Sequence, residues 1–317
     1  MAGYTELPFR MFCRRMGAGA VYTELTSVDG LVRNSPSTWH LLATNPEERP
    51  VAAHLYGSEP AVFAEAAARV AARGGFDWID VNAGCPVPKV VRRGAGAGLM
   101  LDPDRLAAVV RAIRAAVSLP VTVKTRIGPR PDRIVIFDLA AALAEAGVAA
   151  LAIHARPTSA RHSGEAEWDL IGEVKRRHPG VPIIGNGGLT TPRQAVDHLR
   201  RYGVDAVMIG RAALGRPWFF AEAAALAAGR PPPAPPSLPE LRGLILEHLA
   251  GLIELERRHP PARRRHAPEQ IAACRLRAHL VRYVAGLPGA ADLKRRLNSV
   301  RSPADLESAL APVFGAA

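Results

Sequence analysis

One cysteine stands where a strand is predicted to end and a glycine-rich loop to begin. Cys85 follows the run Trp78–Asn82 in the segment DVNAGCPVPKV. Gly84 and Pro86 define the backbone of a tight turn on either side of the thiol. A thiol held in such a turn can give or take a proton, or act as a nucleophile. A buried structural cysteine is the alternative, and the position at a strand end favours chemistry.

Two further predicted strand ends carry a basic side chain. Lys124 lies in VTVKTR, and His154 lies in AIHAR. A basic group pointing into a barrel mouth is costly unless it meets an opposite charge or a polar ligand. In a reduced flavin, one edge of the ring carries negative charge. A fixed basic side chain stabilises this charge, and both Lys124 and His154 fit that role. An ion pair with a barrel carboxylate is the alternative for Lys124.

Glycines end the next two predicted strands. The first group is Asn186-Gly187-Gly188 and the second is Gly210-Arg211. Glycine turns expose backbone N–H groups, and with a following arginine they are typical of a phosphate site after the last two strands of a barrel. The sequence has no GxxxxGK[ST] motif and no strand-borne GxGxxG motif, which argues against ATP and against a nicotinamide bound in a Rossmann fold.

Short β-rich runs alternate with longer amphipathic runs over the first 230 residues. This alternation is typical of a parallel sheet with crossover helices, and strands that are apolar on both faces are covered by helices. We therefore predict an α/β fold, a (β/α)8 TIM barrel, whose sites lie at the C-terminal ends of its strands. The predicted strands are Ala20–Glu24, Val51–Leu55, Trp78–Asn82, Val121–Thr125, Ala150–His154, Ile183–Asn186 and Ala206–Ile209, and the helices between them include Ala61–Ala72, Pro103–Val117, Ile136–Ala146, Pro192–Tyr202 and Arg216–Ala227.

These strands number seven, whereas a closed barrel of this kind has about eight. The chain opens with MAGYTELPFR, which predicts a loop followed by a helix. We therefore expect the first barrel strand to be missing from this chain, with a wrongly assigned start codon as the cause. A sheet that never closes, with two bare parallel edges, is the alternative.

A proline-rich run divides the chain into two domains. Residues 231–239 read PPPAPPSLP, which extends as a semi-rigid linker. We predict a barrel domain over residues 1–230 and an all-helical domain over residues 240–317, where apolar residues recur at helical spacing.

Charge and cysteine usage narrow the functional class. The formal net charge is +12, and a basic chain attracts polyanions, nucleic acid foremost; a merely solvated arginine-rich surface is the alternative. Three scattered cysteines without a CxxC pair argue against a disulfide framework and against a metal site. Because no apolar run reaches the length of a membrane span, we predict a cytoplasmic protein without membrane contact.

Several segments of the chain form an ordered set: MAGYTELPFR, DVNAGCPVPKV with RRGAGAGLML, VTVKTRIG, AIHARP, IIGNGGL and DAVMIGRAALGRPW. This set resembles the tRNA-dihydrouridine synthase family, and the cysteine segment is its most specific match. The tail CRLRAHLVRYVAGLPGAADLKRRLN resembles the C-terminal helical domain of the bacterial enzymes of the B subgroup. The resemblance covers nearly the whole chain and implies FMN as cofactor, NADPH as reductant and tRNA as substrate, with no obligate protein partner.

The resemblance also implies roles for single residues. Cys85 is implied as the general acid and Asn82 as a neighbour of the substrate uracil. Lys124 and His154 are implied as contacts of the flavin ring, and Arg156 as a residue near the substrate or the flavin. The other implied FMN contacts are Met1 through its backbone and, around the ribityl phosphate, Asn186, Gly187, Gly188, Gly210 and Arg211.

Two segments depart from the pattern of the family. His54 stands where the family usually has glutamine, and we expect it still to donate to a flavin carbonyl. The family's HGRTR segment reads HARPT here, and His162 replaces an aromatic residue, while Gly164 and Trp168 keep their spacing.

The implied reaction has two halves, in which NADPH reduces FMN and the flavin N5 then passes hydride to C6 of uracil while Cys85 gives a proton to C5. A thiol with a pKa of about 8.5 is mostly protonated at neutral pH, as this role requires. The uridine must leave its stack to reach such a pocket.

The RNA backbone is expected to contact Lys89, just after the cysteine, and the basic tail. There Arg275, His279 and Arg282 are predicted to share one exposed helix face, with Cys274 among the residues that cover the others. A solvated helix face is the alternative.

Two rival functions stay open. The first is another FMN barrel enzyme that acts on a small molecule, such as a dihydroorotate-type dehydrogenase, which leaves the basic tail unexplained. The second is a tRNA-binding chaperone without catalysis. Cys85 and Lys124 argue against the second rival, whereas His54 and the missing strand leave it open.

Overall fold

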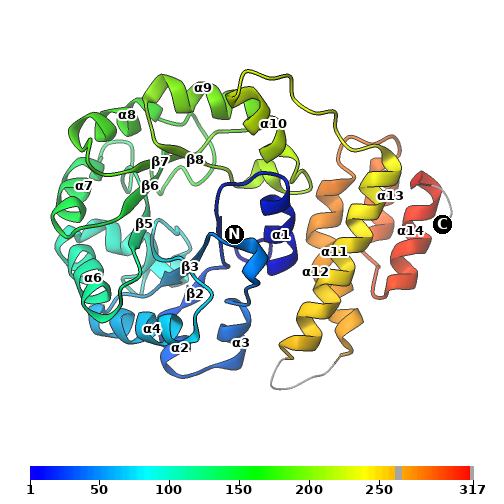
Figure 1. The fold of residues 1–317 in the computed structure, drawn as a ribbon, viewed down its shortest axis with the longest axis horizontal. Helices are drawn as coiled ribbons and strands as arrows, with labels where there is room; N and C mark the ends of the chain where they lie inside the picture. Colours follow the sequence, from blue (N-terminus) through cyan, green and yellow to red (C-terminus); the bar gives the residue numbers. More distant parts are fainter. Residues whose placement is uncertain (261–265, 315–317) are drawn as a thin grey trace.

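The computed structural model describes residues 1–260 and 266–314. These residues form a curved parallel sheet wrapped by helices and, beside it, a bundle of C-terminal helices (Figure 1). The proline-rich stretch after α10 (Phe219–Ala227) leads from one part to the other. None of the helices in the described ranges is long and apolar enough to cross a membrane.

The ladders between strands are all parallel. β1 (Val21–Tyr22) and β2 (Thr26–Ser27) both pair with β3 (Val51–Tyr56), so they form two short pieces of one strand position. The order then runs through β4 (Trp78–Ala83), β5 (Val121–Arg126), β6 (Ala150–His154), β7 (Ile183–Asn186) and β8 (Ala206–Met208). Within the described residues no ladder joins β8 to β1, so the sheet has two edges there. The predicted strands are confirmed, and the parallel sheet with its surrounding helices agrees with the predicted TIM barrel.

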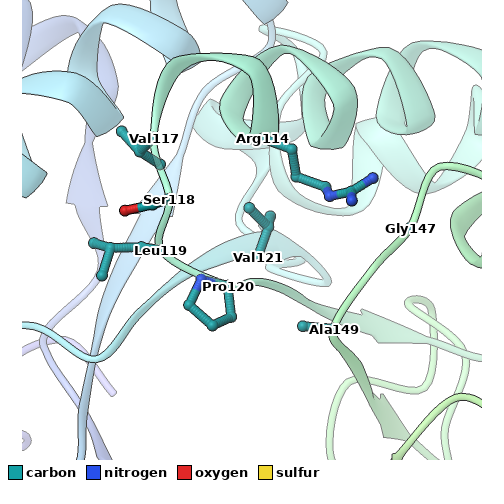
Figure 2. Close-up of a pocket in the computed structure, with 8 residues that line it drawn as sticks. All are labelled: Arg114, Val117, Ser118, Leu119, Pro120, Val121, Gly147 and Ala149. Carbon is teal, nitrogen blue, oxygen red and sulfur yellow. The ribbon is translucent and has the colours of Figure 1, made fainter.

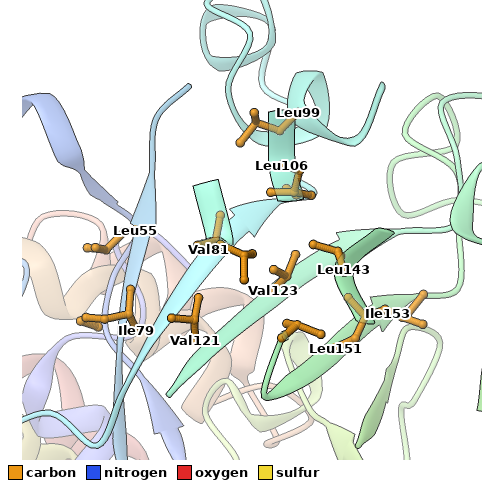
Figure 3. Close-up of a cluster of buried hydrophobic side chains, with 14 of the residues drawn as sticks. Leu55, Ile79, Val81, Leu99, Leu106, Val121, Val123, Leu143, Leu151 and Ile153 are labelled. Carbon is orange, nitrogen blue, oxygen red and sulfur yellow. The ribbon is translucent and has the colours of Figure 1, made fainter. Parts of the chain in front are cut away.

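Helices cover the outside of the sheet because the strand faces turned toward them are apolar, whereas the opposite faces of β4 and β5 carry polar side chains such as Asp80 and Lys124. Val81, Val123 and Ile153 are fully buried in successive strands, and Leu106 and Leu143 from the helices pack into the same cluster (Figure 3). These covering helices are α4 (Pro60–Arg73), α6 (Pro103–Ala116), α7 (Ile136–Glu145), α8 (Trp168–Arg177), α9 (Pro192–Tyr202) and α10, joined by the short elements α2 (Val28–Val32), α3 (Pro36–His40), α5 (Pro88–Val91), η1 (Pro46–Glu48), η2 (Gly96–Leu101) and η3 (Arg211–Ala213).

Local sequence explains where several of these helices begin and end. Proline at a first helical position costs no hydrogen bond and presets φ, and α4, α6 and α9 each begin in this way. At the start of α9, Thr191 and Gln194 form a reciprocal capping box, and the helix ends at Gly203, whose φ is +62°. The helices predicted between the strands are therefore confirmed within about three residues.

The C-terminal part is helical, as predicted. It consists of α11 (Leu238–Arg258), α12 (Pro268–Tyr283), α13 (Ala290–Leu297) and α14 (Pro303–Phe314). Leu252, Leu276 and Leu306 lie in its core, and Phe12 from α1 (Leu7–Arg15) belongs to the same core. The two parts of the molecule therefore share apolar packing.

The prediction for the faces of α12 was wrong. His279 was expected on an exposed basic face but is 1 % exposed, whereas Cys274 was expected to be covered and is exposed. The buried face is built instead around Ala272, Ala273 and Leu276. Two alanines extend the apolar stripe without standing out in a hydrophobic pattern, which explains the rotated assignment.

His279 is buried because it helps to surround a carboxylate at the junction of the two parts. Glu6, directly before α1, is 3 % exposed, and its Oε1 lies 2.7 Å from His248 Nε2 and 3.0 Å from His279 Nε2. Tyr283 Oη lies 3.0 Å from the other nitrogen of His248. Burial alone would raise the pKa of Glu6, but its contacts with His248 and His279 hold that pKa well below its ordinary value. The Glu6 carboxylate is thus satisfied only while α11 and α12 lie against α1.

Removing His248 should therefore be costly. We expect His248→Ala to lower the free energy of unfolding by about 3–5 kcal/mol, because it removes the nearer of the two histidine partners of a buried charge. The matched control is Arg15→Ala, which breaks the exposed pair of Arg15 with Glu247 across the same junction and should cost less than about 1 kcal/mol. Urea denaturation measures both values, and equal losses in the two variants would contradict the importance of the buried contact.

Candidate active site

The Cys85 turn is held by the side chain of Asn82 at the end of β4. Asn82 Oδ1 accepts the backbone N–H of Cys85 at 3.0 Å and that of Gly84 at 3.4 Å. The Cys85 carbonyl accepts the N–H of Ala97 at 3.0 Å. Gly96 is required beside it, since its φ is +57° and a Cβ there would stand 2.9 Å from the Cys85 carbonyl oxygen. The half-buried thiol is therefore presented from a turn with a defined backbone.

His54 and Asp80 extend this arrangement across β3 and β4. His54 Nδ1 lies 2.5 Å from Asp80 Oδ2, and its Nε2 lies 3.0 Å from Asn82 Nδ2. Asp80 is fully buried, and its second oxygen accepts a hydrogen bond from Thr122 on β5. Sequence reasoning missed Asp80, although a lone acid inside an apolar strand is a signal that could have revealed it.

The next strand ends bring three basic side chains together. In the parallel register, Asn82 lies opposite Lys124, and Arg126 lies opposite His154. Burial, and then the charge of Arg126, lower the pKa of Lys124 to about 7, although Asp80 acts in the opposite direction. Burial, and then Lys124 and Arg126, lower the pKa of His154 to about 2. His154 is therefore neutral at physiological pH, and Lys124 is poised to gain full charge when it meets an anion.

Arg126 is a second residue that sequence reasoning left without a role. It is 4 % exposed, and its Nε donates to the Gly84 carbonyl at 3.0 Å. Its Nη1 donates to the carbonyl of Arg161 at 3.0 Å and to those of Arg156 and Pro157 at slightly longer distances. Burial lowers its pKa to about 10. Arg126 thus ties the Cys85 turn to the loop after β6.

The predicted phosphate residues gather on the far side of His154. Gly187 has a φ of +110°, and a Cβ there would stand 3.3 Å from His154 Nε2. Gly188, with a φ of +75°, lies against the guanidinium of Arg156. Gly210 faces the Met1 side chain, with 3.8 Å between a Cβ built on the glycine and the Met1 sulfur. Asn186 donates to the Met208 carbonyl at 2.7 Å, which joins β7 to β8.

Arg156 offers an unused donor to this cluster. Its Nε and Nη2 donate to the Gly164 carbonyl at 3.1 and 2.9 Å, while its buried Nη1 has no partner among the described residues. Burial, and then the exposed Arg211 nearby, lower its pKa. A buried guanidinium N–H without a partner, beside glycines that allow close approach, fits an anionic ligand such as a phosphate.

The residues proposed to contact RNA lie outside this cluster. Lys89 is exposed on α5, directly after the Cys85 turn. Arg282 is exposed on α12, and its backbone lies against Gly215 in the loop that follows η3. Arg275 is instead engaged at the domain junction, where it contacts Glu256 at 2.7 Å and Glu24 at 3.3 Å.

A cavity at the other end of the sheet does not contribute to this site. It has a volume of about 360 Å³ and is lined by Arg114, by residues 117–121 and by Gly147 and Ala149, at the N-terminal ends of β5 and β6 (Figure 2). Among these residues Arg114 alone is ionisable, and it donates to the Ala146 carbonyl. The cavity therefore brings no acid, base or nucleophile together.

Comparison with known proteins gives a consistent result. A sequence model of the family described as dihydrouridine synthase matches residues 1–316. The chain is 37 % identical to tRNA-dihydrouridine synthase B of Pseudomonas aeruginosa, over 95 % of this chain and 87 % of that protein. It is 38 % identical to tRNA-dihydrouridine synthase B of Xanthomonas campestris, over 96 % and 87 %, and 36 % identical to a probable tRNA-dihydrouridine synthase of Mycobacterium tuberculosis, over 98 % and 79 %.

One solved structure supports the fold alone. Histamine dehydrogenase from Rhizobium sp. 4-9 is similar with a TM-score of 0.51 and 14 % sequence identity. The match covers 72 % of this chain and 44 % of that longer chain. It therefore shows that the strands and helices are arranged alike.

The low pKa of His154 leads to a prediction for stability in acid. The ordinary pKa of histidine is 6.5, and the pKa of His154 in the folded chain is about 2. At pH values between these two, the unfolded chain binds a proton at this position that the folded chain does not. The contribution of His154 to stability is therefore fully present above pH 6.5 and is lost as the pH falls. Between pH 7.5 and 5.0 we expect His154→Asn to remove about 2 kcal/mol of the acid-induced loss measured by urea unfolding. The exposed His266→Asn is the control and should leave the curve unchanged; an unchanged curve for His154→Asn would contradict the assignment.

Proposed function

The chain belongs to the dihydrouridine synthase family, and we propose that it reduces uridines in tRNA to 5,6-dihydrouridine with FMN as cofactor and NADPH as reductant. Membership confirms the family that the sequence motifs predicted. The observation that carries the proposal is the Cys85 turn, held at a strand end beside the cations of the next two strands. The family match over residues 1–316 argues against a dehydrogenase that acts on a small molecule.

The residues at the sheet's C-terminal edge fit a phosphorylated flavin. Lys124 is placed to face the edge of the ring that becomes negative on reduction, and its low pKa means that the charge returns fully only beside an anion. Arg156 Nη1 and the exposed Arg211 are placed for the phosphate, next to Gly188 and Gly210. Bound there, FMN supplies the hydride that it has taken from NADPH.

Cys85 is proposed to give the proton that completes the reduction. The half-buried thiol is proposed to face the uracil ring and to give its proton to C5, while FMN bound at the site would supply the hydride for C6. Asn82 holds the turn through two backbone N–H groups and stands next to the place of the ring. A positioned acid of this kind contributes about 10²–10⁴-fold to a rate.

The exposed basic residues near the C-terminal ends of the strands are proposed to bind the RNA backbone. Lys89 lies directly after the cysteine turn, and Arg282 lies beside the loop that carries Arg211. Arg275 is proposed to act indirectly, because its ion pair with Glu24 holds α12 against the barrel, while its pair with Glu256 joins α12 to α11.

Replacing Cys85 separates the two half-reactions. Cys85→Ala should still bind FMN and still be reduced by NADPH, whereas uridine reduction should fall by about 10²–10⁴-fold. The assays are flavin release on denaturation, stopped-flow bleaching of the flavin and quantification of dihydrouridine in tRNA. Cys274→Ala removes an exposed thiol on α12 and should change none of the three.

Two results would contradict this assignment. An equal loss of both half-reactions in Cys85→Ala would make the cysteine structural. Purified wild-type protein that binds FAD in place of FMN, or no flavin after reconstitution, would exclude the proposed cofactor.

The tRNA contacts are tested by salt dependence. In the double variant Lys89→Ala with Arg282→Ala, we expect weaker binding of all tRNAs, and the slope of log K against log salt should fall by about 0.7–0.9 for each phosphate that is no longer neutralised. The control double variant, Arg69→Ala with Arg176→Ala, removes the same charge from the outer helices α4 and α8. Fluorescence anisotropy with labelled tRNA measures both, and identical slopes would show that these two residues do not contact phosphates.

A further inference from the structure

A continuous chain of hydrogen bonds runs from a buried acid to the cysteine turn. It begins at Asp80 inside the sheet, passes through His54 on β3 and Asn82 on β4, and ends at the backbone N–H of Cys85. The chain crosses two strands and ends at the backbone of the residue whose thiol is proposed to deliver the proton. The donor and the acceptor of each hydrogen bond in this chain can be assigned one after another.

The amide of Asn82 has only one orientation that satisfies its neighbours. Its Oδ1 accepts the N–H groups of Gly84 and Cys85, and these backbone groups can only donate. Its Nδ2 must therefore face His54, at 3.0 Å from His54 Nε2. An amide NH₂ can only donate, so His54 Nε2 must be the acceptor in this contact.

This polarity determines the tautomer of His54. With Nε2 as an acceptor, the ring proton sits on Nδ1 and is donated to Asp80 Oδ2 at 2.5 Å. Asp80 is fully buried, and its second oxygen is occupied by Thr122, so it has no freedom to turn away. A carboxylate on one nitrogen thus determines which nitrogen can accept at the other end of the ring.

We propose that His54 and Asp80 are positioning residues that orient Asn82, and through it the Cys85 turn, for proton delivery. This inference rests on the proposed function of Cys85. His54 therefore acts on the thiol side of the site, in contrast to the flavin contact expected from its place in the sequence. Reversing the tautomer of His54 would put two donors face to face at Asn82, and a flipped Asn82 would put two donors face to face at Cys85.

Replacing Asp80 tests this chain of hydrogen bonds. Asp80→Leu removes the acceptor of the His54 Nδ1–H bond, so the tautomer of His54 is no longer determined and Asn82 loses its fixed orientation. We expect uridine reduction at saturating tRNA to fall by about 10–10²-fold, the cost of a misplacement of about 1 Å. Flavin content, reduction by NADPH and KM for tRNA should stay unchanged, since only the second half-reaction uses the turn.

Variants of His54 provide the matched series. His54→Leu removes both hydrogen bonds and should lose as much rate as Asp80→Leu. His54→Gln keeps one acceptor and one donor, so it should regain most of the rate that the leucine variant loses. Tyr22→Phe is the control, because the Tyr22 ring contacts His54 edge-on with 6.2 Å between ring centres and takes no part in the chain. Equal rates in the leucine and glutamine variants would overturn the proposal.

A readout that does not depend on activity separates this inference from the proposed function. In the flavin-loaded protein, ¹⁵N NMR of His54 should show the proton on Nδ1, and Asp80→Leu should populate the Nε2–H form as well. A proton on Nε2 in the unaltered protein would overturn the positioning role even if dihydrouridine is formed. If the protein forms no dihydrouridine while the proton is on Nδ1, the proposed function fails and the orientation of the turn still stands.

Discussion

The buried carboxylate of Glu6 determines how the two parts of this molecule lie against each other. It is enclosed by His248 from α11 and His279 from α12, and a buried carboxylate without such partners would be strongly destabilising. Apolar packing of Phe12 in the core of the helical domain acts in the same direction. With α12 held in this way, Arg282 lies beside the loop after η3, so the basic helical domain borders the end of the sheet where the candidate site lies.

The candidate site itself is lined by buried basic side chains. Lys124, Arg126 and His154 lie on adjacent strands, and burial lowers the pKa of each. Such an arrangement is unfavourable in the free protein unless donors find acceptors, and Arg126 does so through backbone carbonyls. Arg156 has one buried donor without a hydrogen-bond partner among the described residues. An anionic ligand that carries a phosphate and a ring with negative charge along one edge would satisfy these side chains. The flavin that family membership suggests is such a ligand.

The sequence predicted the parts of this structure that depend on local patterns. Strand positions, most helices, the Cys85 turn and the glycine groups follow from apolar runs and turn residues, which act within a few positions of the chain. The exposed face of α12 was predicted wrongly, because the partner that buries His279 is Glu6, 273 residues away. Asp80 and Arg126 were missed for a related reason. Their partners lie on neighbouring strands, and a single strand's sequence does not show which polar residue it will face.

The same strand register that builds the sheet also assembles the chemistry. His54 lies opposite Asp80, Asn82 opposite Lys124, and Arg126 opposite His154. Because side chains alternate between the two faces of a strand, a shift of one residue between β3 and β4 would turn His54 away from Asp80 and would also move apolar side chains out of the core. The burial of residues such as Leu55 and Val81 therefore stabilises the hydrogen-bonded chain to Cys85 indirectly. Core packing and the orientation of the thiol turn depend on one and the same register.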